Sequence, residues 1–111
     1  MPHTKDIRKF IRLKEDSSIK YHVLHSQRIE NALMQDLGLG GIRFFASHFI
    51  PRNSLLKIEV ALKKAKKIIS AKVKTVWIKT LFANERYEIG ATFIEIDKEA
   101  LKFLHHYLSI H

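Results

Sequence analysis

The stretch Asp36-Leu37-Gly38-Leu39-Gly40-Gly41 leads directly into Ile42-Arg43-Phe44-Phe45, and our interpretation of the fold starts from this junction. Three glycines within four residues remove the Cβ atoms that would hold a ligand away. They also allow positive φ angles, so that backbone N–H groups can turn outward and bind an anion. The same residues suit a tight turn between two antiparallel strands, in which Asp36 bonds to the local backbone. The sequence leaves both interpretations open.

Segments on both sides of this stretch alternate between apolar and polar residues, as half-buried β-strands do. The predicted strands cover residues 19–25, 32–36, 42–46, 55–62, 68–80 and 87–96. In the fifth predicted strand, a period of two places the following residues on one face: Ile69, Ala71, Val73, Thr75 and Trp77.

The carboxyl-terminal part of the chain is expected to form one helix. Asp97 is a suitable N-cap, and an apolar side follows it with Leu101, Leu104 and Leu108. Such a helix must pack against the strands. Six strands and one terminal helix predict a mainly β protein, either a small antiparallel barrel or a sandwich, with the helix across one opening.

Composition limits the classes of function. The 111 residues suit one domain, and 20 Lys plus Arg against 11 Asp plus Glu give a formal net charge of +9, which favours anionic partners. Four lysines stand at positions 63–67, which we interpret as a solvated hairpin tip, with a nucleic-acid patch as the alternative. Cysteine is absent, which excludes disulfides and thiolate metal sites.

The sequence offers no motif for catalysis, for a metal site or for membrane insertion. No signal peptide and no run of about 20 apolar residues is present, so we expect a cytoplasmic protein without a membrane span. The seven histidines lack ligand spacing, and we find neither a nucleophile elbow nor a phosphate loop. We therefore expect no enzyme activity, no metal and no cofactor.

The amino-terminal segment contains two arginines four residues apart. Residues 1–17 carry charge without a sustained period, which predicts a flexible arm before a barrel domain over residues 18–111. Arg8 and Arg12 supply planar guanidinium groups that suit phosphates and guanine edges, and Lys9 lies between them. The alternative is an amphipathic lead-in whose arginines are only solvated.

Together these features resemble the PilZ family, the bacterial receptor domain for cyclic di-GMP. Arg8 and Arg12 match its Arg-x-x-x-Arg motif, and Asp36 and Gly41 match its Asp/Asn-x-Ser-x-x-Gly motif. Gly38 stands where the family usually has serine. The resemblance extends over residues 5–108 and includes the Val76-Trp77 pair and the segment 89–93.

The resemblance implies a six-stranded antiparallel β-barrel with a C-terminal helix, and it implies cyclic di-GMP as the ligand. Carried over to this chain, Arg8 and Arg12 would hold phosphate and stack on or bond to guanine. Many relatives have another arginine where this chain has Ile7, and Lys9 or Lys5 would supply part of the missing charge.

The second motif would supply the opposite wall of the same site. Asp36 would accept hydrogen bonds from guanine N1 and N2, while Gly38 and Gly41 would let the backbone approach the ligand. Trp77 either flanks the ligand or packs in or on the barrel.

Three functions are compatible with these residues. The first is a receptor for cyclic di-GMP that changes its arm conformation and signals to an unidentified downstream protein. The second is a basic barrel that binds single-stranded nucleic acid, which is disfavoured because the later strands show lysines without interleaved aromatics. The third is a PilZ-like adaptor that has lost its ligand, for which Gly38 and Ile7 are the support.

Overall fold

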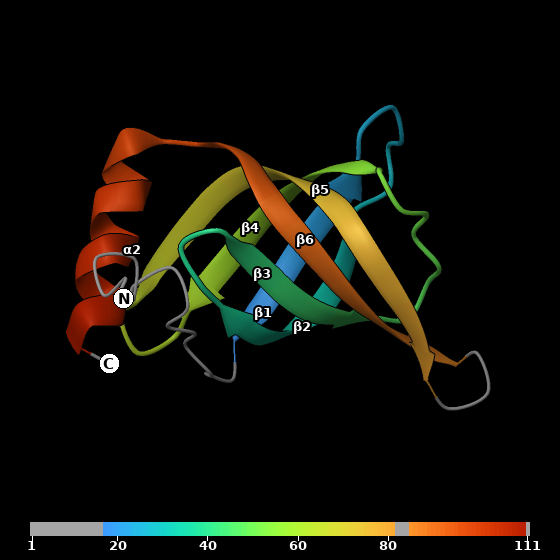
Figure 1. Cartoon of the computed structure of the whole chain (residues 1–111), viewed down its shortest axis with the longest axis horizontal. Helices are drawn as coiled ribbons and strands as arrows, with labels where there is room; N and C mark the ends of the chain where they lie inside the picture. Colours follow the sequence, from blue (N-terminus) through green and yellow to red (C-terminus); the bar gives the residue numbers. More distant parts are fainter. Residues whose placement is uncertain (1–16, 82–84, 111) are drawn as a thin grey trace, which may run out of the picture.

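A computed structural model of the chain describes residues 17–81 and 85–110, and Figure 1 shows its arrangement. Within this part of the chain, the strands close into an antiparallel barrel in the order β1-β2-β3-β6-β5-β4. The elements are β1 (Ser18–Val23), β2 (Glu30–Leu37), β3 (Gly41–Ala46), β4 (Leu55–Leu62), β5 (Lys67–Leu81), β6 (Arg86–Ile96) and α2 (Lys98–Ile110). The predicted six-stranded antiparallel barrel with a C-terminal helix is therefore confirmed.

The strands form where the sequence alternates. β4 matches the predicted segment residue for residue, and its even-numbered residues from 56 to 62 are buried, whereas Lys57 and Glu59 are exposed. The inward side chains of all six strands meet in one core, which includes Ile19, Phe44 and Ile89. The lysine-rich segment between β4 and β5 is a turn, as predicted, in which the Lys66 N–H donates to the Lys63 carbonyl at 3.2 Å.

Ser17, the first described residue, packs against the barrel just before β1 begins at Ser18. Ser17 is 1% exposed, and its carbonyl accepts a hydrogen bond from the Met34 N–H at 2.9 Å. The predicted arm residues Arg8, Lys9 and Arg12 lie outside the described residues.

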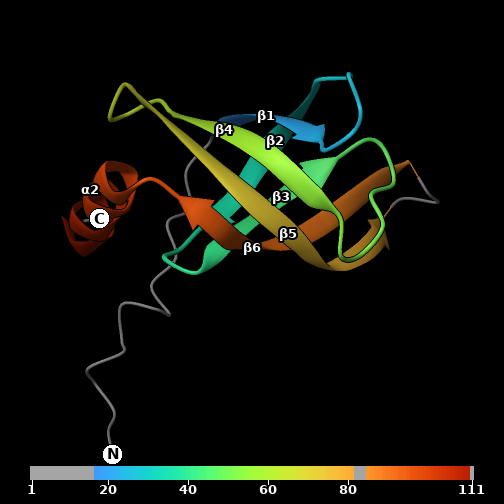
Figure 2. The same ribbon diagram turned by 90° about the horizontal axis from the view of Figure 1, so that it is seen from above.

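The terminal helix packs across the end of the barrel at which the β2–β3 and β4–β5 turns lie (Figures 1 and 2). The predicted N-cap is confirmed, since the Glu99 N–H donates to Asp97 Oδ2 at 3.1 Å. The residues of its packed side are Ala100, Phe103, Leu104, Tyr107 and Leu108.

The prediction that Leu101 belongs to this apolar side is wrong, because Leu101 is 39% exposed. The packed residues follow an i, i+3, i+4, i+7, i+8 pattern that begins at residue 100, and residue 101 falls just outside that stripe. No helix in the described part of the chain is long and apolar enough to cross a membrane.

The strand pairing has three register shifts that the sequence period did not reveal, one of them between Lys72 and Val73 in the pairing of β5 with β6. The other two are β-bulges that bear on the site described below. In β2 the pairing with β3 shifts between Met34 and Asp36, and in β5 the pairing with β6 shifts between Thr75 and Trp77. An extra residue in a strand turns every later side chain to the opposite face. The prediction that Trp77 shares the face of buried Thr75 is therefore wrong: Val76 is the extra residue, and Trp77 is 36% exposed.

Candidate functional site

Four residues from four different strands lie next to one another across β2, β3, β6 and β5. Asp36 is the register partner of Arg43, Arg43 of Gly90, and Gly90 of Trp77. The two bulges turn Asp36 and Trp77, which stand at the two ends, to the outer side of the barrel. We call Asp36, Arg43, Gly90 and Trp77 the bulge row.

An ion pair fixes one end of the bulge row. The Arg43 Nε–H donates to Asp36 Oδ1 at 2.9 Å, and Nη2 of the same guanidinium donates to Oδ2. The Asp36 side chain is fully buried, whereas the Arg43 side chain is 36% exposed. The hydrogen bond from Arg43 to Asp36 raises the pKa of the guanidinium, so Arg43 stays cationic. A guanidinium has five N–H donors, so Asp36 holds the group in place while other donors remain available to a ligand.

Two glycines make room for the other end of the row. A Cβ on Gly41 would lie 2.1 Å from the Ala91 carbonyl oxygen, so glycine is what lets β3 approach β6 closely at this point. A Cβ on Gly90 would lie 2.3 Å from the Trp77 indole, so the missing side chain lets the indole lie against the strand. The backbone of β6 is therefore open between Arg43 and Trp77.

The glycine stretch itself is a turn between β2 and β3. The Gly38 N–H donates to the Gly41 carbonyl at 2.9 Å, and the Gly40 carbonyl accepts from the Phe93 N–H at 3.0 Å and from Thr92 Oγ1 at 3.1 Å. All four glycines of the sequence lie in the described part of the chain, and none has a positive φ. The expectation of an anion nest built on positive φ angles is therefore wrong, because these hydrogen bonds hold the turn in ordinary backbone conformations.

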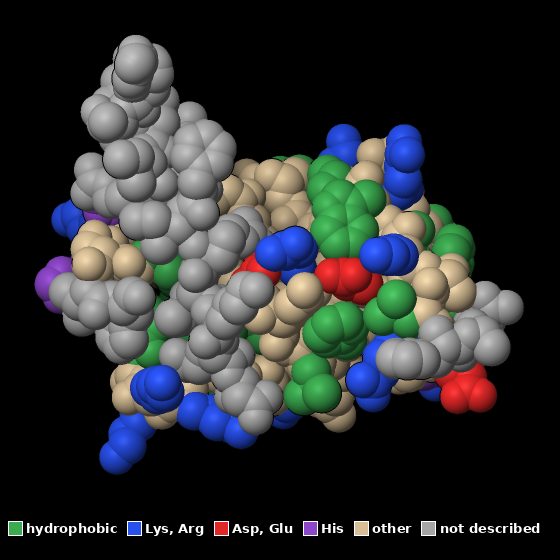
Figure 3. Space-filling view, turned by 60° about the horizontal axis from the view of Figure 1, so that its bottom comes forward, with side chains coloured by type: hydrophobic (Ala, Val, Ile, Leu, Met, Phe, Trp, Pro, Cys, Tyr) green, Lys and Arg blue, Asp and Glu red, His purple; other side chains and the backbone are tan. Residues whose placement is uncertain are grey.

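A hollow of about 350 Å³ lies over the bulge row. Its lining residues are Gly40, Gly41, Ile42, Arg43, Val76, Trp77, Gly90 and Ala91. Figure 3 shows the mixed character of this side of the barrel, where basic and acidic side chains stand beside exposed apolar ones. A guanidinium at one side, an indole at the other and bare backbone between them suit a flat, anionic ligand, because both groups can stack on a base and the guanidinium also binds phosphate.

The structure brings together some of the predicted site residues and adds one. Gly41 and Trp77 line the hollow, and Asp36 lies beneath Arg43 at its edge. Gly38 begins the turn and does not line the hollow.

Arg43 was missed by sequence reasoning, since it reads as an ordinary polar position between two inward strand residues. The available signal was its place two residues after a glycine turn that follows an aspartate. The bulge in β2, which aligns Arg43 with Asp36, has no such signal.

The sequence model of the PilZ domain matches residues 6–109 of the chain. The chain belongs to the PilZ domain family. PilZ domains are non-catalytic receptor domains for c-di-GMP, so the expected family and the expected absence of catalysis both hold at the level of the family. No curated protein matches the chain.

Solved structures with the same fold include three that cover most of the PilZ chain. The inhibitor of motility MotI/DgrA of Bacillus subtilis superposes with a TM-score of 0.77 at 13% identity, over 90% of this chain and 48% of that one. MrkH of K. pneumonia in its apo state superposes with a TM-score of 0.72 at 18% identity, over 89% of this chain and 48% of that one. The PilZ domain of YcgR from Escherichia coli, solved with c-di-GMP, superposes with a TM-score of 0.68 at 14% identity, over 89% of this chain and 86% of that one. This chain thus spans about half the length of MotI/DgrA and of MrkH, and the likeness to all three is one of fold.

Proposed function

We propose that this PilZ domain is a cytoplasmic receptor for cyclic di-GMP, which binds over the bulge row and signals through its amino-terminal arm to a downstream protein. The observation that carries the proposal is the hollow in which a fixed guanidinium, open backbone and an indole face one ligand. The family supports the choice of ligand, as does the YcgR PilZ domain that was solved with c-di-GMP.

The chemistry of the hollow fits one half of a cyclic dinucleotide. Cyclic di-GMP carries two phosphates and two guanines. The remaining N–H donors of Arg43 suit a phosphate oxygen or guanine O6 and N7, and the indole of Trp77 suits a guanine face. Since 350 Å³ is at the small end of ligand pockets, the other half extends beyond the hollow. In this proposal Arg8 and Arg12 of the arm bind that second half, and Lys9 adds charge.

Asp36 acts mainly through Arg43 in this proposal. Its carboxylate is fully buried and accepts from the guanidinium, so it holds Arg43 in the orientation that faces the hollow. A direct contact of Asp36 with guanine N1 and N2 requires Arg43 to leave the carboxylate first. Binding would then include a side-chain exchange that an arm closing over the ligand can sense.

An adaptor that no longer binds ligand is the second candidate. It is favoured by Gly38, which replaces the family serine and so lacks its hydroxyl, and by the burial of Asp36. Replacing Gly38 with serine tests it. Because Gly38 has no positive φ, serine meets no left-handed strain there, and one added neutral hydrogen bond would raise affinity by a few-fold to about tenfold.

Isothermal titration tests the proposal directly, with cyclic di-GMP, GMP and a short single-stranded oligonucleotide at two salt concentrations. We expect cyclic di-GMP to bind and Arg8→Ala, Arg12→Ala and Arg43→Ala each to weaken it about tenfold or more, because each removes a charge-assisted contact. Lys64→Gln on the β4–β5 turn is the matched charge control and should leave the affinity unchanged.

Each alternative has its own outcome in these titrations. No binding of any probe by the parent or by Gly38→Ser supports the adaptor. Tight binding of the oligonucleotide alone supports a nucleic-acid binder. An equal loss of cyclic di-GMP affinity in Lys64→Gln and Arg43→Ala would show that only net charge matters, and would remove the bulge row from the site.

A further inference from the structure

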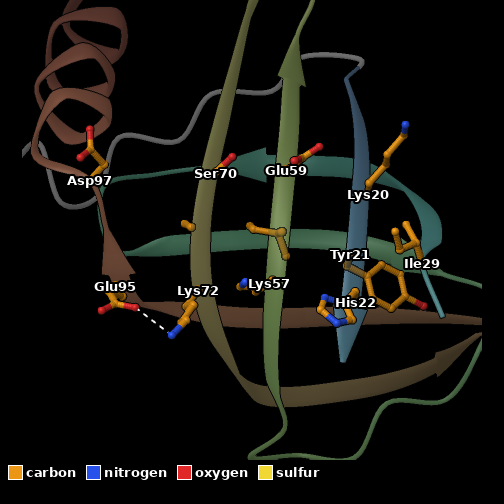
Figure 4. A pocket seen from close by; sticks show the side chains of 12 residues that line it. Lys20, Tyr21, His22, Ile29, Lys57, Glu59, Ser70, Lys72, Glu95 and Asp97 are labelled. Atoms are coloured by element: carbon orange, nitrogen blue, oxygen red, sulfur yellow. Dashed lines mark ion pairs between the residues drawn. The ribbon is translucent and has the colours of Figure 1, made fainter. Parts of the chain in front are cut away.

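A second and larger hollow, of about 490 Å³, lies on the outer side of β1, β4 and β5 and reaches the end of β6. It shares no lining residue with the hollow over the bulge row. In Figure 4 its charged and polar side chains form two rows across the strands. The first row is Lys20, Glu59 and Ser70, and the second is His22, Lys57, Lys72 and Glu95.

The second row, which we call the basic row, places two lysines in direct opposition. His22 is the register partner of Lys57, and Lys57 is the register partner of Lys72. Directly opposed side chains on neighbouring strands have Cβ atoms about 5 Å apart, and like charges in that position destabilise the pair. The lysines of the β4–β5 turn can spread into solvent, whereas the pairing of β1, β4 and β5 keeps those of the basic row side by side.

Only one lysine of the basic row has an acidic partner in the described part of the chain. Lys72 Nζ lies 3.1 Å from Glu95 Oε1, where the dashed line in Figure 4 marks the ion pair. Lys57 has no ion pair among the described residues, and it stands between His22 and Lys72. Glu59, the next outward residue of β4, belongs to the other row and faces Lys20 and Ser70. The charges of the lining balance as a whole, with Lys20, Lys57 and Lys72 against Glu59, Glu95 and Asp97. The local feature is Lys57 in the middle of the hollow, which has no ion pair among the described residues and stands next to a second lysine.

We infer that this hollow is a second ligand site, which takes a small molecule bearing a phosphate or carboxylate group. Lys57 binds the anionic group at the centre of the basic row, with His22 and Lys72 on either side. A bound anion removes the repulsion that the register imposes, so the ligand and the fold gain from the same contact. The volume is that of a small-molecule pocket.

The remaining lining residues suit the body of such a ligand. Ser70 and the Lys20–Glu59 pair offer hydrogen-bond donors and acceptors in the first row. Ile29 is 68% exposed and also lines the hollow, so it can cover an apolar part. The site thus has an anion position, a polar side and one apolar side chain.

Titration followed by amide NMR shifts tests this inference, with pyrophosphate and citrate as separate probes at constant ionic strength. We expect saturable shifts around residues 22, 57 and 72, an affinity about tenfold weaker in Lys57→Gln, and the parent affinity in Lys64→Gln. Binding of one probe alone assigns the site to the phosphate or to the carboxylate class. Shifts that do not saturate, or an equal loss in both variants, would overturn the site.

Thermal unfolding without any anion supplies an independent measurement. Lys57→Gln should melt at the same temperature as the parent or slightly higher, because it removes the repulsion in the basic row. Added pyrophosphate should raise the melting temperature of the parent more than that of Lys57→Gln. A lower melting temperature of the variant would mean that Lys57 stabilises the fold by itself, which contradicts the inference. Cyclic di-GMP titration of Lys57→Gln separates the two sites, since its affinity should equal that of the parent.

Discussion

The bulge row and the basic row are both sets of four residues that cross four neighbouring strands, but the barrel builds them differently. Two bulges and two glycines position the bulge row, whose opposite charges meet and whose backbone is open. Regular pairing of β1, β4 and β5 positions the basic row, whose like charges meet. The proposed cyclic di-GMP site is therefore tied to the stability of the fold. The basic row can change its charge with little effect on the barrel.

The largest effect is expected for Gly41→Ala. The added Cβ would lie 2.1 Å from the Ala91 carbonyl oxygen, so β3 and β6 would have to separate, at a cost of about 3 kcal/mol in the free energy of unfolding. Gly40→Ala is the matched control, because nothing lies within 4 Å of its Cβ position, and it should stay within about 0.5 kcal/mol of the parent. Urea unfolding measures both, and equal stabilities would show that the close approach of β3 to β6 is not needed.

The free energy of unfolding should fall by different amounts when Arg43 or Asp36 is replaced. Arg43→Ala removes one charged partner of the fully buried Asp36 carboxylate and should cost about 2–3 kcal/mol, below the range for a completely buried pair because Arg43 is partly exposed. Asp36→Asn leaves a guanidinium that water can reach, and should cost about 1 kcal/mol. Urea unfolding of both variants gives the order, and a larger loss in Asp36→Asn would contradict the view that Asp36 holds Arg43.

Gly90→Ala should change the shape of the site at only a small cost in stability. Its Cβ would overlap the Trp77 indole, but this is an exposed side chain that can swing away, so we expect a cost of about 1 kcal/mol. Trp77 is the only tryptophan, so its fluorescence spectrum reports the displacement. Cyclic di-GMP affinity should fall while the barrel remains folded. An unchanged spectrum with unchanged affinity would exclude the indole from the site.

The smallest effect concerns Tyr21, which contacts the core beneath the second hollow. Burial raises its pKa above the ordinary value of 10.0, and Glu30 raises it further. The unfolded chain therefore ionises first, so the stabilisation is complete below pH 10 and is lost as the pH rises through the pKa of the folded state. Tyr21→Phe should show a shallower loss of unfolding free energy above pH 10, by at most about 1.4 kcal/mol per pH unit. Identical slopes would show that other groups cause the alkaline loss.

The sequence predicted those strands in which apolar and polar residues alternate. β4 has its predicted bounds, the Asp97 cap begins α2, and the lysine-rich turn joins β4 to β5, because each of these depends on neighbours along the chain. The basic row also follows from such strands once their register is known. The helix stripe was displaced by one residue, since several nearby apolar positions satisfy the same period.

The sequence by itself determined a basic, mainly β domain with a glycine turn, a terminal helix and two motifs that resemble those of PilZ domains. Only the tertiary structure decided that Asp36 meets Arg43, and that Trp77 turns outward onto Gly90. The reason is physical. An alternating pattern is written in consecutive side chains, whereas a bulge is a mismatch between the hydrogen bonds of two strands and exists only when both strands are paired.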